Sequence, residues 1–171
     1  GHGTSASPIY QLFVEQAKKL NPRYISMIIP ARWYSGGKGL DNFRDMMLKD
    51  KRITHLVDYF DSTECFPGVD ISGGVCYFLW ERDREDSCQV ESHLNKKVTN
   101  IKRPLLEKGA DTFIRFNEAV NILRKVKKLN ENSFETIVSE RRPFNLDTNM
   151  KLSDEKKSNY IKCNAYPKEG Y

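Results

Sequence analysis

The chain has 171 residues and a net charge of +5, with 39% hydrophobic and 30% charged residues. This length fits one domain, or one subdomain and the start of another, and the composition is that of a globular protein. The longest apolar run, residues 73–80, is far shorter than the roughly 20 residues of a membrane-spanning helix, and no secretory signal pattern is visible. We therefore expect a cytoplasmic protein with no membrane contact.

The positive charge is unevenly distributed along the chain. Residues 1–85 contain eleven basic and eleven acidic residues, whereas residues 86–171 contain seventeen basic and twelve acidic ones. A basic half beside a neutral half is typical of a protein that contacts a polyanion with one part and uses the other as a scaffold. A lysine-rich solvated surface would give the same count.

The cysteines and histidines do not predict a metal site. Cys65, Cys76, Cys88 and Cys163 are too far apart in sequence for zinc-binding pairs, and the three histidines are scattered. We expect reduced thiols, with Cys76 as a small core residue.

The first elements alternate between helix and strand. Gly1 and His2 are interpreted as the remnant of a purification tag. Residues 8–20 are predicted to form a helix, which Ser7 caps and Pro8 begins. Residues 24–30 are almost wholly apolar and predict a strand buried on both faces, followed by a glycine-rich loop over residues 31–39.

The second group of elements completes an α/β pattern. Residues 40–50 predict a helix, residues 53–60 a strand, residues 61–73 a loop and residues 74–82 a third strand. No helix separates the last two strands, so we expect the third one to be antiparallel and to lie beside its predecessor.

The pattern loosens after residue 86. Residues 90–108 predict either short strands or an extended connection. Residues 112–129 predict an amphipathic helix, and a short helix follows Ser133. Residues beyond 141 show no periodicity.

No self-contained catalytic motif is present. The glycines at 36, 37 and 39 fit neither a phosphate-binding loop nor a dinucleotide-binding fingerprint, and there is no nucleophile elbow. The carboxylate–lysine motif of a nuclease is also absent, which argues against the cleavage part of a restriction enzyme.

Four segments in order resemble successive motifs of the gamma-type adenine-specific DNA methyltransferases, most closely those of fused, type IIG-like restriction–modification enzymes. They are Ser7 to Ala17, Ile28 to Trp33, Cys65 to Val69 and Gly73 to Phe78. The resemblance covers residues 3–145. It implies the distal half of a doubly wound α/β sheet, with about three strands of which the last is antiparallel and inserted between two others, and a helical, basic C-terminal extension. Residues 3–86 would be the C-terminal half of the catalytic domain, and residues 87–171 a connection and the start of the target-recognition region.

The resemblance also implies a reaction whose central parts are not in this sequence. The family transfers a methyl group from S-adenosylmethionine to the exocyclic amine of an adenine flipped out of the duplex. Its cofactor loop and its Asn-Pro-Pro-Tyr motif both precede the segment matched here. The tetrapeptide Asn21 to Tyr24 has three of those four letters, but it ends a helix and opens a strand. We therefore expect no catalytic or cofactor-binding residue in this chain, and an inactive isolated chain.

The resemblance suggests one wall of a target-base pocket. Phe66 matches the position of the family aromatic that contacts the flipped adenine, although it could also be a loop residue tucked under the sheet. Pro30, Arg32 and Trp33 follow a strand end, where open α/β sheets bind ligands. Trp33 could instead be a packing residue, and Arg32 could meet a phosphate or only solvent.

The expected partner is double-stranded DNA. Lys102, Arg103, Arg141 and Arg142 are candidates for contacts with the DNA backbone, or they are ordinary surface charges. The alternative function is a DNA-binding specificity segment with no chemistry of its own. An exposed edge strand at residues 24–30 would also favour self-association.

Overall fold

The computed structural model describes residues 8–37, 39–132, 134–139, 163–165 and 168–170. Contacts divide the chain into two units, residues 1–129 and residues 130–171. The second unit contains the short 3-10 helix η3 (Phe134–Ile137) and a hairpin of β6 (Cys163–Ala165) and β7 (Lys168–Gly170). Everything that bears on the candidate site lies in the first unit.

The first unit contains three helices, five strands and two 3-10 turns in its described residues. They are α1 (Tyr10–Lys19), β1 (Tyr24–Pro30), η1 (Ala31–Ser35), α2 (Asp41–Lys49), β2 (Ile53–Tyr59), η2 (Ser62–Glu64), β3 (Val75–Glu81), β4 (Cys88–Leu94), β5 (Lys97–Arg103) and α3 (Asn117–Lys128).

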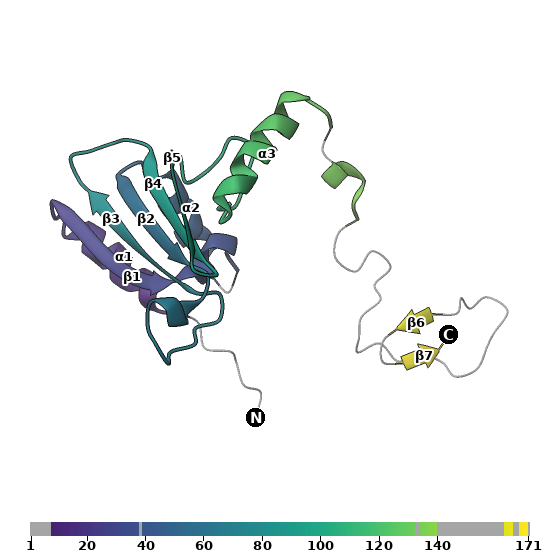
Figure 1. Ribbon diagram of the computed structural model, residues 1–171, viewed down its shortest axis with the longest axis horizontal. Coiled ribbons are helices and arrows are strands. Elements are labelled where there is room, and N and C mark those ends of the chain that lie inside the picture. Colours follow the sequence, from purple (N-terminus) through teal and green to yellow (C-terminus); the bar gives the residue numbers. More distant parts are fainter. Residues whose placement is uncertain (1–7, 38, 133, 140–162, 166–167, 171) are drawn as a thin grey trace. The chain divides into compact units, whose positions relative to one another are not determined.

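The five strands form one sheet in the order β1-β3-β2-β4-β5 (Figure 1). β3 is antiparallel to both β1 and β2 and lies between them, as predicted. β4 pairs with β2 in parallel, and β5 returns antiparallel to β4. The parallel strands β1, β2 and β4 therefore end at the same edge of the sheet.

The expectation of about three strands was wrong, because residues 88–103 extend the sheet by a hairpin. The hairpin turns at Asn95 and Lys96, which have φ of 51° and 62°. Two consecutive residues with positive φ are typical of the tight turn that matches the twist of a hairpin, and Asn is favoured at its first position. The usual glycine is missing, which weakened the turn signal in the sequence.

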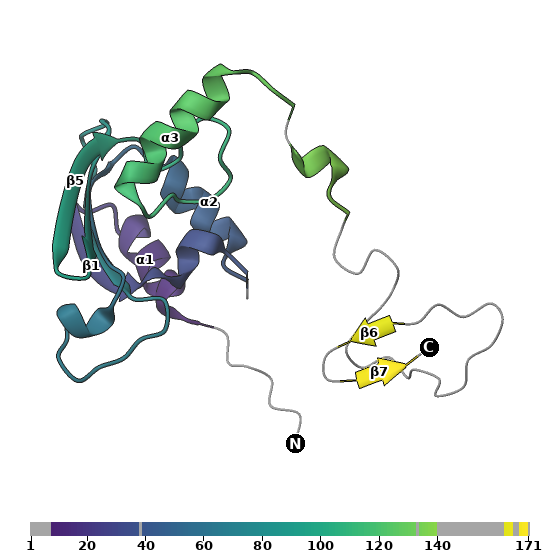
Figure 2. The same ribbon diagram turned by 45° about the vertical axis from the view of Figure 1, so that its right-hand side comes forward.

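The core lies between the sheet and the helices on one of its faces. Figure 2 shows α1 and α2 on the same side of the sheet. As predicted, α2 buries Phe43, Met47 and Leu48 against the sheet. In α1, by contrast, only Val14 is buried, and the apolar stripe formed by Ile9, Leu12, Phe13 and Leu20 faces solvent.

Helix α3 begins five residues later than predicted. Residues 111–116 are not helical, and Phe116 has an extended conformation just before the helix. Val120 is fully buried, whereas Phe116 and Val126 of the predicted apolar face are more than half exposed. None of the helices in the described ranges is long and apolar enough to cross a membrane.

Candidate functional site

The two loops with the family-like motifs lie at the same edge of the sheet. The first loop follows β1 and contains η1, and the second, residues 60–74, connects β2 to β3. Since β1 and β2 run in the same direction, both loops start at carboxyl ends of parallel strands. Ligands in open α/β sheets bind in this position.

A cavity of about 500 Å³ lies between these loops and the start of α1. Its lining combines residues from three segments of the chain. They are Pro8 and Tyr10, then Pro30, Arg32, Ser35, Gly36, Gly37 and Leu40, and finally Ile71 and Ser72. Two of the predicted pocket residues, Pro30 and Arg32, are therefore part of one cavity.

Tyr10 and Arg32 supply polar groups at this cavity. The Tyr10 hydroxyl is buried and makes no hydrogen bond of good geometry in the described structure. Burial raises the pKa of Tyr10 to about 12, so the hydroxyl keeps its proton at neutral pH. Arg32 is exposed and forms no ion pair with the described residues. A hydroxyl without a hydrogen bond of good geometry and a cation without an ion pair suit a ligand with acceptor atoms and negative charge.

Phe66 lies in the second loop but outside the lining of the cavity. Its side chain is 39% exposed. The loop is well braced: the Phe66 amide donates to the Ser62 carbonyl at 2.8 Å, and the Ser62 hydroxyl donates to the Val69 carbonyl at 2.8 Å. The Ser62 oxygen also accepts from the Ile71 amide at 2.7 Å. Phe66 is thus an exposed aromatic ring on an ordered loop, and not a residue tucked under the sheet.

Trp33 is placed in the core, which corrects its predicted position at the pocket rim. Its ring is 0% exposed, and its Nε1 donates to the Cys76 sulfur at 3.4 Å. Tyr34 and Phe43 pack against it, with ring centroids 4.6 and 5.9 Å away. Because burial raises the pKa of Cys76 to about 12, the thiol stays protonated. Trp33 therefore anchors η1 in the core and has no surface for a base.

A buried ion pair lies beneath the second loop. Arg115 donates from Nε and Nη2 to the two carboxylate oxygens of Asp58 at 2.8 and 2.7 Å, and Asp58 is 0% exposed. Burial raises the pKa of Asp58, and the hydrogen bonds from Arg115 offset only part of that rise. The guanidinium also lies over the Phe60 ring, 4.0 Å from its centroid.

Sequence reasoning missed Asp58 and Arg115 as well as most of the cavity lining. An aspartate between Val57 and Tyr59 in a predicted strand indicates a buried ion pair, since a buried carboxylate needs a partner. Its partner is 57 residues away in the chain, and no local pattern indicates such a distance.

The predicted DNA-backbone residues have different environments. Lys102 is exposed and pairs with Asp86 at 2.6 Å. Arg103 is only 1% exposed, so it is an interior residue and not a candidate for a phosphate contact. It donates to the Ile114 carbonyl at 2.5 Å and to Asn117 Oδ1 at 3.2 Å. Arg141 and Arg142 lie outside the described residues.

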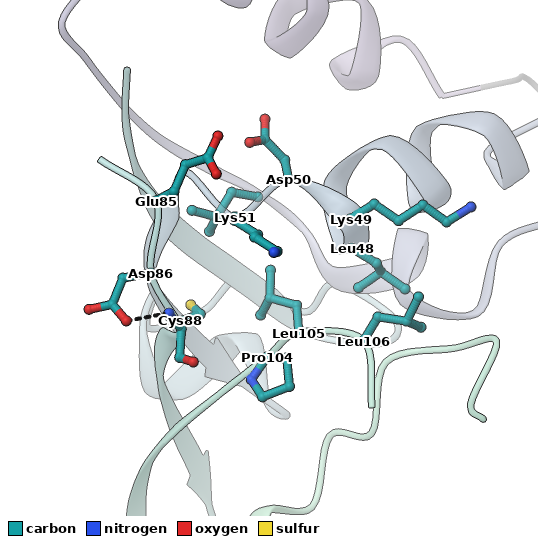
Figure 3. A pocket seen from close by; sticks show the side chains of 12 residues that line it. Leu48, Lys49, Asp50, Lys51, Glu85, Asp86, Cys88, Pro104, Leu105 and Leu106 are labelled. Carbon is teal, nitrogen blue, oxygen red and sulfur yellow. Dashed lines mark hydrogen bonds between the residues drawn. The ribbon is translucent and has the colours of Figure 1, made fainter. Parts of the chain in front are cut away.

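A second cavity, of about 470 Å³, lies at the opposite edge of the sheet. Figure 3 shows the side chains of Leu48, Leu105 and Leu106 close together, with Asp50 and Glu85 among the charged groups that surround them. The cavity lies at the amino ends of β2 and β4, where α/β sheets do not usually bind ligands. Among the described residues there is no group of three or more His, Cys, Asp or Glu that could hold a metal ion.

Comparison with known proteins agrees with the motifs. Residues 1–66 match the family described as Eco57I restriction-modification methylase. A protein from Mycoplasma pneumoniae described as an uncharacterized adenine-specific methylase is 38% identical over 96 residues. The chain is similar to a segment of an adenine-specific methylase. The predicted resemblance to adenine-specific methyltransferases of restriction–modification systems is therefore confirmed.

The similarity is partial in extent. The aligned segment is 56% of this chain and 23% of the Mycoplasma methylase. The methyltransferase subunit of a type I restriction-modification system from Streptococcus thermophilus is a structural neighbour with 12% identity and a TM-score of 0.29. That alignment covers 64% of this chain and 21% of the neighbour. A TM-score this low does not define a common fold.

Proposed function

We propose that this chain is the distal part of a DNA adenine methyltransferase of a restriction–modification system and that it forms one wall of the target-base pocket. The observation that carries the proposal is the cavity at the carboxyl ends of β1 and β2, where residues of two family-like motifs, Ser7 to Ala17 and Ile28 to Trp33, meet the second loop. The alternative, a specificity segment without chemistry, is not favoured, because both the family and the curated relative are methylases.

In the proposed reaction the methyl group comes from S-adenosylmethionine and the acceptor is the exocyclic amine of a flipped adenine. The residues of this chain do not hold the cofactor, because the sequence contains neither a glycine-rich cofactor loop nor Asn-Pro-Pro-Tyr. Their role is to receive the base. Phe66 stacks on one face of the adenine, while Pro30 and Arg32 form the rim of the cavity beside it.

We further propose a gamma-type parent with the catalytic half at residues 3–86 and the target-recognition region beginning after it. Lys102, together with Arg141 and Arg142, would neutralise DNA phosphates, and such contacts make binding salt-sensitive. The free edge of β1 would be covered by the rest of the catalytic sheet or, in the isolated chain, by a second copy. A cytoplasmic location follows from DNA as the substrate.

The test is methyl transfer by the full-length gene product, measured with radiolabelled S-adenosylmethionine and followed by identification of the methylated base. We expect N6-methyladenine from the full-length protein and no transfer by this chain alone. Methylcytosine, or no methylated base, would contradict the proposal.

The site assignment is tested by Phe66→Ala in the same full-length protein. Loss of one base–aromatic stack costs about 1–3 kcal/mol, so kcat/KM should fall roughly 5- to 150-fold. Val69→Ala is the matched control, because Val69 is exposed to a similar degree in the same loop. Equal losses in the two variants would remove Phe66 from the pocket.

A further inference from the structure

The second loop is fastened to a part of the chain that lies beyond the proposed catalytic half. Arg115 precedes α3, and its Nη1 donates to the Gly73 carbonyl at 2.9 Å. The same guanidinium holds Asp58 through two hydrogen bonds and lies over the Phe60 ring. One side chain therefore connects the end of β2, the end of the loop and the segment that leads into α3.

Both ends of the loop depend on residues after 86. At its start, the Phe60 amide donates to the His93 carbonyl of β4 at 3.1 Å. Within η2, Glu64 accepts from the amide of Lys96 in the β4–β5 turn at 3.3 Å. At its end, Arg115 holds Gly73, and the neighbouring Gly74 carbonyl accepts from the Ala31 amide of the first loop at 3.0 Å.

The pair of Arg115 with Asp58 has the geometry that fixes a position. A bidentate guanidinium–carboxylate pair restricts direction as well as distance. Because Asp58 is fully buried on the rigid sheet, it serves as a fixed point, and the remaining donors of Arg115 transmit that position to the loop backbone. Lysine has the same charge but cannot form the fork.

We propose that Arg115 is a positioning residue for the target-base loop, so that the orientation of Phe66 is set by the segment leading into α3. This inference rests on the proposed function, which assigns the base contact to Phe66. It adds that residues after 86 hold the loop of the base pocket in place. Displacement of α3 would therefore change the orientation of Phe66.

The chain offers a closely matched control at the other end of β2. Arg52 also forms a bidentate pair with a nearly buried aspartate, Asp50, at 2.8 and 3.0 Å, and it also lies over an aromatic ring, Trp80. It makes no contact with the loop in the described structure. Arg115→Lys and Arg52→Lys therefore each remove a bidentate pair with an aspartate, but only Arg115 is hydrogen-bonded to the second loop.

The first experiment measures amide hydrogen exchange in this chain. In Arg115→Lys we expect exchange of the Ile71 and Gly74 amides, which are hydrogen-bonded within the loop, to accelerate at least tenfold, with no change at these amides in Arg52→Lys. Acceleration in both variants, or in neither, would overturn the proposal. If Arg115→Lys does not fold, Phe60→Leu removes the ring under the guanidinium, and the same two outcomes apply.

The second experiment uses the full-length protein and DNA with 2-aminopurine at the methylated adenine. Binding by the wild type should raise the fluorescence, because the base leaves the stack. Arg115→Lys should reduce that rise and lower kcat roughly 10- to 100-fold with KM for DNA unchanged, since small misplacements at a reacting centre have effects of this size. A wild type that gives no rise would contradict the proposed function itself, whereas a normal rise and kcat in Arg115→Lys would contradict only the role of Arg115.

Discussion

At the scale of single residues, Asp50 is a hub that connects three parts of the fold. Its carboxylate accepts from Lys18 of α1 at 2.8 Å, from Arg52 at 2.8 and 3.0 Å and from Trp80 Nε1 of β3 at 2.9 Å. The Asp50 side chain is only 7% exposed. Burial raises the pKa of Asp50, but the hydrogen bonds from Arg52 and Lys18 outweigh that effect and hold it well below the usual range.

Asp50→Asn should destabilise the chain strongly. It removes the negative charge but leaves Lys18, which is 12% exposed, without its partner. Breaking one side of a buried pair costs about 3–5 kcal/mol. Urea denaturation measures the change, and Asp45→Asn is the control, because Asp45 pairs with Lys49 on the surface. A free energy of unfolding that falls equally in both variants would contradict the assignment.

The same carboxylate gives the chain an acid-sensitive stability. Because the pKa of Asp50 is lower in the folded than in the unfolded state, its contribution is complete above about pH 4, the ordinary range of aspartate. The contribution is lost as the pH falls further toward the folded-state value. The wild type should therefore lose more stability than Asp50→Asn as the pH falls from about 5 to about 2. Parallel stability curves for the two proteins would exclude Asp50 as the source.

At the scale of elements, local patterns predicted the first three strands well, but they did not settle β4 and β5 or the contacts between elements. The apolar run at residues 24–30 and the helix–strand–strand sequence at residues 40–82 gave β1, α2, β2 and β3 within one or two residues. Such elements depend on periodicity, which is local. The start of α3 was misplaced because Arg115 is used in the ion pair with Asp58, and this tertiary contact leaves no trace in the helical pattern.

For the candidate site, the structure gives the places of the residues and not their roles. Pro30 and Arg32 line the cavity and Phe66 is exposed in the adjacent loop, and their contact with a target base stays a prediction. Trp33 was placed at the pocket rim because it follows a strand end, with a packing role as the alternative, and Arg103 was assigned to the surface because of its charge. Their burial depends on Cys76, Asn117 and Ile114, which only the fold brings near them.

The junction between the second loop and β3 depends on a glycine. Gly74 has φ of 80°, and a Cβ there would lie 2.0 Å from the Tyr59 carbonyl oxygen. Gly74→Ala therefore combines backbone strain with a clash that neither backbone can avoid. Gly68→Ala has nearly the same φ and open space around the Cβ, so it should cost only about 1–2 kcal/mol of strain. We expect Gly74→Ala to lower the urea midpoint clearly further than Gly68→Ala, and similar midpoints would contradict the close approach.

At the scale of the whole molecule, the two edges of the sheet differ in chemistry. β5 carries the exposed residues Lys97 and Lys102, and charged edges resist further strand pairing. β1 has no charged residue and no neighbour on its outer side in the described structure. Beside it, the outward stripe of α1 exposes Ile9, Leu12, Phe13 and Leu20. An uncharged sheet edge next to an exposed apolar helix face is suited to binding another polypeptide segment.

The isolated chain should therefore associate through α1 and β1. Sedimentation at increasing concentration should show a rising mean mass, and Phe13→Lys should reduce this effect. Val98→Lys, a similar change at an exposed apolar position on β5, should leave it unchanged. A wild-type chain that stays monomeric at millimolar concentration, or equal effects of the two substitutions, would rule out this surface.

The parallel pairing of β4 with β2 bears on attempts to exchange sequence specificity between enzymes. A chimaera joined at residue 86 would replace strands that hydrogen-bond to Leu56, Val57 and their neighbours, and would discard Arg115 together with its hold on Gly73. The chimaera would then lack the native partner strand of β2 and the hydrogen bonds of Arg115 to the second loop. A junction placed after Lys128, at the end of α3, keeps all five strands, the ion pair and this helix from one parent, and new recognition modules are best attached there.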